Sequence, residues 1–345
     1  MSIAHFMTLD GPRRLRRGEV TIDEPAPGRV IVDIIHTGIC GSDIHGYTDG
    51  IMQPAIFGHE WVGTVAALGD AVTGLQVGQR VVGGLGPACG TCEYCRAGHT
   101  RHCEIVRAES IGLDADAPEF GAFASRVHLP ARRVLPVPDA LTDVEAALVE
   151  PTTVAFHAVR RVAPELGAFT VVQGAGPIGL ATALNARAAG AGKMIISEPS
   201  PARRALATRL GFDTVVAPSD LKAALRDLRG SLRADVVYEC TGLAPLLQQS
   251  AKLLRRGGTL GLLGYPVIDS TVSYGYWQDR ELTVIGSICY THDDFAGAMQ
   301  GIADGRLDVE PLHTGSFGLA SLQTMFEELE SGHSEHAKVL ISPHD

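Results

Sequence analysis

A glycine-rich turn between a buried strand and an apolar helix is the feature that most constrains how this chain can fold. Residues 169–173 read Phe-Thr-Val-Val-Gln, residues 174–179 read Gly-Ala-Gly-Pro-Ile-Gly, and residues 180–189 are rich in alanine and leucine. In this strand–turn–helix context, a G-x-G-x-x-G pattern lets backbone amides at a helix N-terminus approach a pyrophosphate. The residues of the turn that are predicted to bind a dinucleotide are Gly174, Gly176, Pro177, Ile178 and Gly179.

Further strand-like segments follow this turn, and helix-like segments separate most of them. They are residues 193–197, 214–216, 235–240, 258–264 and 281–286. Six strands with crossover helices predict one doubly wound parallel Rossmann sheet. We therefore expect a dinucleotide-binding domain over residues 154–288.

The carboxylate of Glu198 indicates which dinucleotide is bound. Glu198 follows the second strand, nineteen positions after Gly179. A carboxylate at this place binds the ribose 2′-hydroxyl and repels a 2′-phosphate, which favours NAD. Arg203 and Arg204 lie five and six residues further on and keep NADP as an alternative, with Arg203 counted among the cofactor-binding residues.

The N-terminal part of the chain has a different pattern. Residues 20–135 are dense in valine, isoleucine and glycine, and turn residues separate short strand-like runs at 30–35, 61–65 and 80–82. This pattern predicts an antiparallel barrel or sandwich, so we expect a mostly-β, barrel-like domain over residues 1–153.

The C-terminal residues 289–345 are too few to form a comfortable core of their own. They contain one amphipathic helix near 319–329 and a closing strand at 338–341. We expect them to return to the first domain, which makes the Rossmann domain an insertion in an α/β protein. A substrate would then bind between the domains, at the carboxyl ends of the parallel strands.

Four cysteines in a glycine-rich and polar loop, residues 86–106, have the spacing of a closed metal site. Their pattern is C-x2-C-x2-C-x7-C, formed by Cys89, Cys92, Cys95 and Cys103. Four thiolates can surround one zinc ion and stabilise a lobe that lacks its own core. An iron–sulfur cluster is the main alternative, but the distant fourth cysteine, with no proline after it, favours structural zinc. His102 is a possible substitute ligand.

A second group of possible ligands mixes sulfur, nitrogen and oxygen. Cys40 lies between Gly38 and Gly41, and the pair His59-Glu60 follows in the same region. Glu150, directly before a proline, offers another carboxylate. Mixed donors of this kind predict an open, catalytic zinc site.

The overall charge and the cysteine usage limit the possible partners and compartment. The formal charge of −10 argues against nucleic acid or an anionic membrane as a partner. Residues 166–186 are uncharged, but glycines and a proline interrupt them, so no spanning helix is expected. The seven cysteines are an odd number without a signal peptide, which favours a reduced, cytoplasmic protein.

Together these motifs resemble the zinc-dependent medium-chain dehydrogenase/reductase (alcohol dehydrogenase) family, across essentially the whole chain. Cys40 with His59-Glu60 and Glu150-Pro151 is most similar to its sorbitol, butanediol and threonine dehydrogenase branch. The resemblance implies a GroES-like catalytic domain and hydride transfer between NAD and a secondary alcohol (polyol, diol, amino alcohol or cyclitol), giving the ketone. It also implies a homodimer or homotetramer, associated through residues near 271–285.

The resemblance also implies roles for single residues. Cys40 and His59 would hold the catalytic zinc, with Glu60 or Glu150 as the carboxylate bound directly or through water. Ser42 and His45 match the proton-relay positions of the family, and Glu150 offers a second route for the proton.

One departure and several alternatives remain open. Sorbitol-type members carry Arg-Tyr where this chain reads Cys289-Tyr290, which favours a less hydroxylated or differently anchored alcohol. An NADP-dependent alcohol or carbonyl reductase, a zinc-free reductase of alkenes or quinones, and a binding protein without turnover are the other hypotheses. Candidate walls of the substrate pocket are Tyr47, Phe120, Trp277 and Tyr290.

Overall fold

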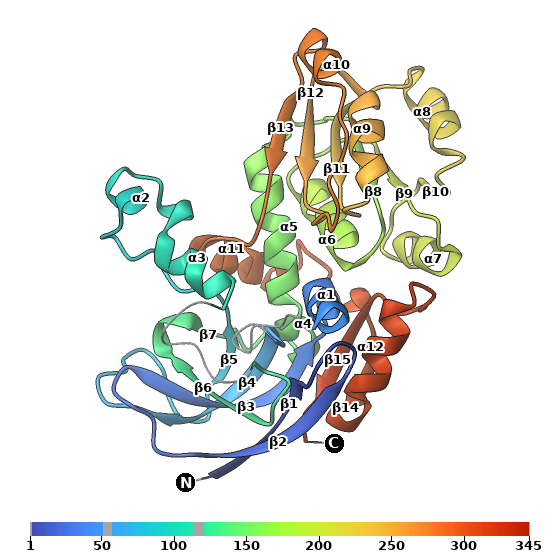
Figure 1. The fold of residues 1–345 in the computed structure, drawn as a ribbon. Helices are drawn as coiled ribbons and strands as arrows, with labels where there is room; N and C mark the ends of the chain where they lie inside the picture. Colours follow the sequence, from blue (N-terminus) through green and yellow to red (C-terminus); the bar gives the residue numbers. More distant parts are fainter. Residues whose placement is uncertain (1, 51–56, 113–120, 345) are drawn as a thin grey trace. The chain divides into compact units, whose positions relative to one another are not determined.

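The structure is a computed structural model that describes residues 2–50, 57–112 and 121–344 (Figure 1). The chain divides into two compact units. The first comprises Met1–Glu150, Tyr290–Ala303 and His313–Asp345, and the second comprises Pro151–Cys289 and Asp304–Leu312. The second unit thus includes a short segment, 304–312, that the sequence analysis assigned to the first.

The second unit is built on a six-stranded sheet in which all neighbouring strands are parallel. Its strand order is β10-β9-β8-β11-β12-β13, which is the 3-2-1-4-5-6 order of a Rossmann sheet. The strands are β8 (Thr170–Gln173), β9 (Met194–Ser197), β10 (Val215–Val216), β11 (Ala234–Glu239), β12 (Leu254–Leu262) and β13 (Thr283–Gly286). The doubly wound sheet predicted from the sequence is confirmed.

Helices cover both faces of this sheet (Figure 1). Alternate strand residues such as Val171 and Val237 pack with α8 and α9 in one buried cluster. On the opposite face, Val162 of α5 lies so close to Gly261 that a Cβ there would meet it at 3.0 Å. The helices are α5 (Val149–Val162), α6 (Pro177–Ala188), α7 (Pro201–Arg209), α8 (Leu221–Arg229), α9 (Ala244–Lys252) and α10 (Tyr274–Asp279).

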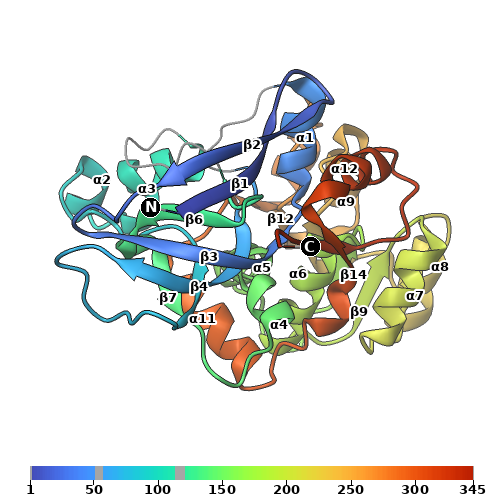
Figure 2. The same ribbon diagram turned by 90° about the horizontal axis from the view of Figure 1, so that it is seen from below.

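The first unit contains a mostly antiparallel sheet of order β14-β15-β3-β4-β5-β7, with β6 also paired to β3. A separate ribbon of β1 and β2 lies beside β6, as Figure 2 shows. The strands are β1 (Ser2–Leu9), β2 (Leu15–Ile22), β3 (Arg29–Gly38), β4 (Glu60–Leu68), β5 (Arg80–Gly83), β6 (Arg126–Pro130), β7 (Val134–Pro136), β14 (His313–Gly318) and β15 (Lys338–Ser342). Because β15 pairs with β3 next to β4, the C-terminal strand reaches the region of Cys40 and His59.

Short helices complete the first unit. Those of the cysteine-rich loop are α2 (Glu93–Arg96), η2 (Thr100–His102) and α3 (Glu104–Ser110), and the others are α1 (Gly41–Asp49), η3 (Ala131–Arg133), α4 (Asp143–Ala147), α11 (His292–Ala303), η5 (Leu319–Ser321) and α12 (Leu322–Glu330). A further turn, η4 (Glu310–Leu312), belongs to the second unit. Within the residues that the structure describes, no helix has the length and apolar character needed to cross a membrane.

The cysteine-rich lobe is attached to the sheet of the first unit through a buried carboxylate. Glu109, at the end of α3, accepts a hydrogen bond from the backbone amide of Gly86 at 2.8 Å and pairs with the guanidinium of Arg132. Its side chain is fully buried. This ion pair fixes the end of the lobe that adjoins the sheet. The outer part of the lobe has the cysteines to stabilise its fold.

Candidate active site

The thiol, imidazole and carboxylate predicted to bind a metal lie together in the first unit. Cys40 is the N-cap of α1, His59 precedes β4, and Glu60 begins β4 opposite Gly38 of β3. Their ligand atoms all lie within 4.8 Å of one another. The positive end of the α1 helix dipole lies at this N-terminus, where Cys40 is the cap residue.

Asp43, in the first turn of α1, fixes the geometry of this group. Its buried carboxylate accepts hydrogen bonds from the amides of Cys40 at 3.0 Å and Gly58 at 3.2 Å. It also lies 3.5 Å from Nδ1 of His59, which leaves Nε2 as the nitrogen available to a ligand. Asp43 had no role in the sequence analysis, although it stands three residues after Cys40.

The surroundings of His59 favour positive charge on its ring. Burial lowers the pKa of His59, but Asp43 and Cys40 outweigh it and raise that pKa well above its usual value. Anionic neighbours that favour a proton on the ring also favour a positive ion bound to it.

Lys338 is the second functional residue that the sequence analysis missed. Its ammonium donates to both oxygens of Glu60, at 2.7 and 2.6 Å, and to the carbonyl of Ile39 at 3.0 Å. Lys338 is 2% and Glu60 1% exposed, and although burial lowers the pKa of Lys338, Glu60 raises it overall. The sequence signal that could have indicated its role is that Lys338 is the single charged residue of the largely apolar strand β15.

We expect Lys338→Met to destabilise the first unit by about 3–5 kcal/mol, because it leaves Glu60 buried without its cation. Urea unfolding followed by circular dichroism measures this change. Lys222→Met is the matched control, since Lys222 is exposed on α8 and should shift the unfolding free energy by less than about 0.5 kcal/mol. Equal stability of the two variants would contradict the pairing.

Glu150 is close to this group but not part of the set within 4.8 Å. It lies in the first turn of α5, 9% exposed, and Tyr290 forms a hydrogen bond with it. Burial raises the pKa of Glu150 to about 7. The charge of His59 opposes this shift and that of Glu60 adds to it, so the three side chains share one electrostatic environment.

Ser42 and His45 are both exposed on α1. They lie three residues apart, so their side chains share a face of this helix. The structure therefore leaves both accessible to solvent beside Cys40.

The four candidate pocket walls have different surroundings. Tyr290 is buried, packs on Phe295 and forms the hydrogen bond with Glu150. Tyr47 is fully buried, donates to the carbonyl of Arg13 at 3.0 Å and packs on Phe326, so its assignment to the pocket was wrong. Trp277 donates to the amide oxygen of Gln248 and packs on the core of the second unit. Phe120 lies outside the described residues.

The four cysteines of the lobe also come together. Their sulfur atoms lie within 4.8 Å of one another, and all seven cysteines of the chain are free of disulfides. Sγ of Cys89 accepts from the amides of Thr91 and Cys92 at 3.4 and 3.3 Å, and Sγ of Cys103 accepts from the amide of Cys89 at 3.3 Å. Backbone donors directed at sulfur stabilise thiolates, as a metal site requires.

Acidity differs among these thiols. Hydrogen bonds from Thr91 and Cys92 lower the pKa of Cys89 to about 6, whereas burial raises the pKa of Cys95 to about 12. His102 is exposed and lies outside the sulfur cluster, and its Nε2 accepts from Arg101 at 3.1 Å. The geometry therefore does not favour His102 as a substitute ligand.

The glycine turn of the second unit has the shape of a dinucleotide cradle. Gly174 has φ +94°, and a Cβ at Gly179 would collide with the carbonyl oxygen of Gly174. A Cβ at Gly176 would meet nothing within 4 Å, so this side of the turn, where Pro177 begins α6, is open. The turn thus permits a close approach of a phosphate to its amides.

The two side chains predicted to contact the cofactor ribose, Glu198 and Arg203, differ in their hydrogen bonds. Glu198 is 4% exposed and accepts from the amides of Ala175 at 2.7 Å and Ser200 at 2.8 Å. Nε of Arg203 is buried without a hydrogen-bond partner among the described residues. Arg204 instead donates to the carbonyls of residues 198 and 199. An open turn with an unpartnered guanidinium nitrogen fits a bound dinucleotide.

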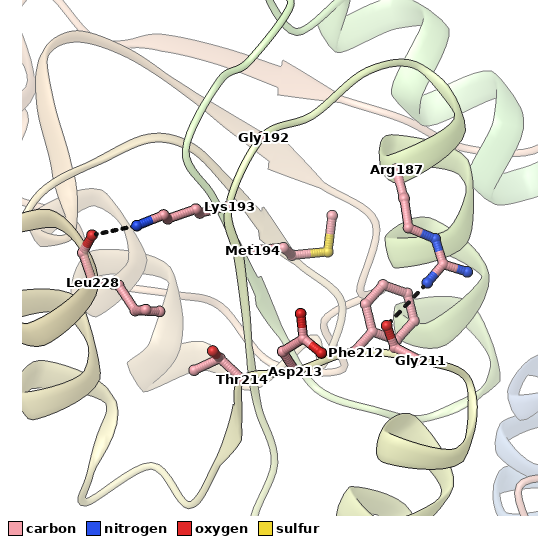
Figure 3. Close-up of a pocket in the computed structure, with 9 residues that line it drawn as sticks. All are labelled: Arg187, Gly192, Lys193, Met194, Gly211, Phe212, Asp213, Thr214 and Leu228. Carbon is pink, nitrogen blue, oxygen red and sulfur yellow. Dashed lines mark hydrogen bonds between the residues drawn. The ribbon is translucent and has the colours of Figure 1, made fainter.

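A hollow of about 350 Å³ in the same unit lies elsewhere (Figure 3). It adjoins Met194, at the start of β9, whereas Glu198 follows the end of this strand. Its two cations already donate to main-chain carbonyls, Lys193 to Leu228 and Arg187 to Gly211, as Figure 3 shows. The hollow is therefore separate from the cofactor turn.

Comparison with known proteins identifies the family of the chain. Residues 26–139 match the alcohol dehydrogenase GroES-like domain, and residues 177–304 match the zinc-binding dehydrogenase domain. Both parts of the expected fold are thereby confirmed.

Relatives match over nearly the full chain. Sorbitol dehydrogenase of Bacillus subtilis is 31% identical, covering 91% of this chain and 90% of that protein. The 2-dehydro-3-deoxy-L-galactonate 5-dehydrogenase of Pseudoalteromonas atlantica is 34% identical, covering 92% of each. The crystal structure of 2R,3R-butanediol dehydrogenase from Bacillus subtilis superimposes with a TM-score of 0.84 at 27% identity, covering 99% of this chain and all of that one. The chain therefore belongs to the zinc-dependent medium-chain dehydrogenase family and is an oxidoreductase.

Proposed function

We propose that this enzyme transfers a hydride between a secondary alcohol and NAD, giving the ketone. The observation that carries the proposal is the group of Cys40, His59 and Glu60, whose mixed donors lie within 4.8 Å beside the buried Glu150. Relatives named for a polyol and for a sugar acid support an alcohol of the polyol, diol, amino-alcohol or cyclitol class.

The residues proposed to hold the catalytic zinc are Cys40, His59 and Glu60. When bound, zinc supplies Lewis-acid polarisation of the substrate oxygen. Asp43 orients the ring of His59, and Lys338 holds the carboxylate of Glu60 in place. Three protein ligands of this kind would leave a coordination position for substrate, as is typical of catalytic sites. The four lobe cysteines are proposed to hold the structural zinc.

Two routes are proposed for the proton of the alcohol. Burial and the nearby charge of Glu60 raise the pKa of Glu150 against the opposing effects of His59 and Tyr290, so its carboxylate can hold a proton. Ser42 and His45 share an exposed face of α1 and can pass a proton to solvent. The variants Glu150→Gln and Ser42→Ala distinguish the two routes. The variant that loses turnover identifies the route that the proton takes.

NAD is the proposed cofactor because the carboxylate of Glu198 is fixed at the glycine turn by two amides. For Glu198→Gln we expect the ratio of kcat/KM with NADP to that with NAD to rise about tenfold, since a like charge no longer repels the 2′-phosphate. Steady-state kinetics with both cofactors measures this ratio, which does not depend on the fraction of active enzyme. An unchanged ratio would assign cofactor choice to Arg203 instead.

Self-association is proposed through the edge strand β13, into a homodimer or a homotetramer of two such pairs. β13 is the last strand of its sheet and carries no charge. Val284 within it and Ile288 just after it are 36% and 54% exposed. Uncharged, exposed edges of this kind pair with another strand. The strand proposed to pair with this edge and continue the sheet is β13 of a second copy of the chain.

Val284→Lys should therefore shift the protein toward monomer in sedimentation-velocity runs at micromolar concentration. Val77→Lys, in the first unit and 64% exposed, is the matched control and should leave the oligomer intact. A monomeric native protein would refute the proposed interface. The free thiols are compatible with the reducing cytoplasm that we propose as its location.

A screen of alcohols tests the activity itself. Polyols, diols, amino alcohols and cyclitols are offered with NAD, and NADH absorbance is followed, with primary alcohols as the comparison set. We expect turnover with at least one secondary alcohol class and a lower kcat/KM with primary alcohols. Reduction of activated alkenes, with no alcohol oxidised, would favour the alkene or quinone reductase.

A further inference from the structure

We propose that Glu239, at the end of β11, is a positioning residue for the dinucleotide. Its carboxylate fixes the loop 240–243, which supports the glycine turn from the side. The inference rests on the proposed cofactor site and adds a residue to it that acts through the neighbouring loop.

The carboxylate of Glu239 is 4% exposed and is bound by donors of its own loop. Oε1 accepts from the amide of Thr241 at 2.8 Å and from its hydroxyl, and Oε2 accepts from the amide of Gly242 at 3.1 Å. Within the described part of the chain, no lysine, arginine or histidine pairs with it. A buried carboxylate without a cation is costly unless such bonds compensate, and each of these is strengthened by its charge.

The main chain of Glu239 connects this loop to a second one. Its carbonyl accepts from the amides of Leu263 at 2.9 Å and Gly264 at 3.0 Å. A Cβ at Gly264 would collide with the amide of Gly242, and one at Gly242 would meet the carbonyl of Tyr265. The loops 240–243 and 263–265 therefore pack backbone against backbone beside Glu239.

The loop 240–243 rests directly on the dinucleotide turn. A Cβ at Gly174 would lie 3.0 Å from Cγ2 of Thr241, and one at Gly179 would lie 3.6 Å from Cβ of Cys240. The amide of Cys240 also donates to the carbonyl of Gln173, the last residue before the turn, at 3.1 Å. A shift of Thr241 is thus transmitted to the amides that face the cofactor, where small displacements have large effects.

Glu239→Gln tests this role with nearly the same shape. A glutamine has one acceptor oxygen, so its NH₂ group must face either the amide of Gly242 or the donors of Thr241. We expect the Kd of NADH and the KM of NAD to rise about tenfold, the effect of one unsatisfied buried donor. Because zinc and the alcohol bind elsewhere, kcat at saturating NAD should change much less than KM.

Two further variants complete the experiment, with NADH binding followed by fluorescence and folding by circular dichroism. Thr241→Val removes the hydroxyl donor and should weaken NADH binding in the same direction, but by less. Glu165→Gln, an exposed carboxylate before β8, should leave binding unchanged.

The outcomes separate the two proposals. Native affinity for NADH in folded Glu239→Gln overturns the inference and leaves the proposed function standing. If Glu239→Gln does not fold, native affinity in Thr241→Val overturns it. Wild-type protein that binds neither NADH nor NADPH contradicts the proposed function, and the inference with it.

Discussion

Cys40→Ser should abolish alcohol oxidation while one zinc ion per chain remains bound in the lobe. Lewis-acid stabilisation by a catalytic metal contributes several kcal/mol, so we expect kcat/KM to fall by at least about 10³-fold. We expect the remaining proposed ligands, His59 and Glu60, to hold the ion poorly without the thiolate, because Glu60 is also engaged by Lys338. Elemental analysis of the purified variant and NADH formation measure both effects.

Cys240→Ser is the control for the loss of zinc. Cys240 is a half-buried thiol of the second unit, and it belongs to neither group of metal-ligand candidates. This variant should keep the full zinc content. Native turnover in Cys40→Ser would show that the mixed-donor group is not the catalytic centre.

Cys92→Ser should unfold the cysteine-rich lobe and remove its zinc. Few side chains of the lobe are buried apart from Cys95, Cys103 and Val106, while Tyr94 and Ile105 are 45% exposed. A segment with so little core depends on its metal, which contributes about 10–16 kcal/mol in small zinc domains. We expect rapid proteolysis within residues 86–106 and a lower thermal midpoint.

Peptide mapping after brief trypsin treatment locates the first cleavage, and zinc analysis gives the loss of one ion. Cys289→Ser, outside the lobe, is the matched control. Unchanged zinc content and protease resistance in Cys92→Ser would contradict a metal-held lobe. Iron and visible colour in the native protein would establish the iron–sulfur alternative.

The Rossmann unit could be predicted because its signals are local. The strands from β8 to β13 contain short apolar runs, and the glycine turn carries its own geometric constraints in adjacent residues. The same holds for the lobe, where four cysteines lie within fifteen positions of one chain segment. Metal-ligand spacing in one loop needs no knowledge of the fold.

The environment of the mixed-donor group could not be predicted, because it depends on distant pairings. Lys338 and Glu60 are 278 residues apart and meet only because β15 and β4 both pair with β3. Tyr290 and Glu150 are also far apart in the sequence, and their hydrogen bond depends on the fold. The ribbon of β1 and β2 was also missed, because charged residues in β2 obscure a clear strand pattern.

Selective removal of one metal tests the account most directly. The structure offers a mixed-donor group that we propose as an open site and a four-cysteine group that we propose as a closed one. Zinc content and NADH formation from a secondary alcohol are measured on one sample before and after treatment with dipicolinate, and again after zinc is returned. We expect the chelator to extract one of two zinc ions and to stop turnover, and added zinc to restore it. Undiminished turnover after that ion has been removed would contradict the account.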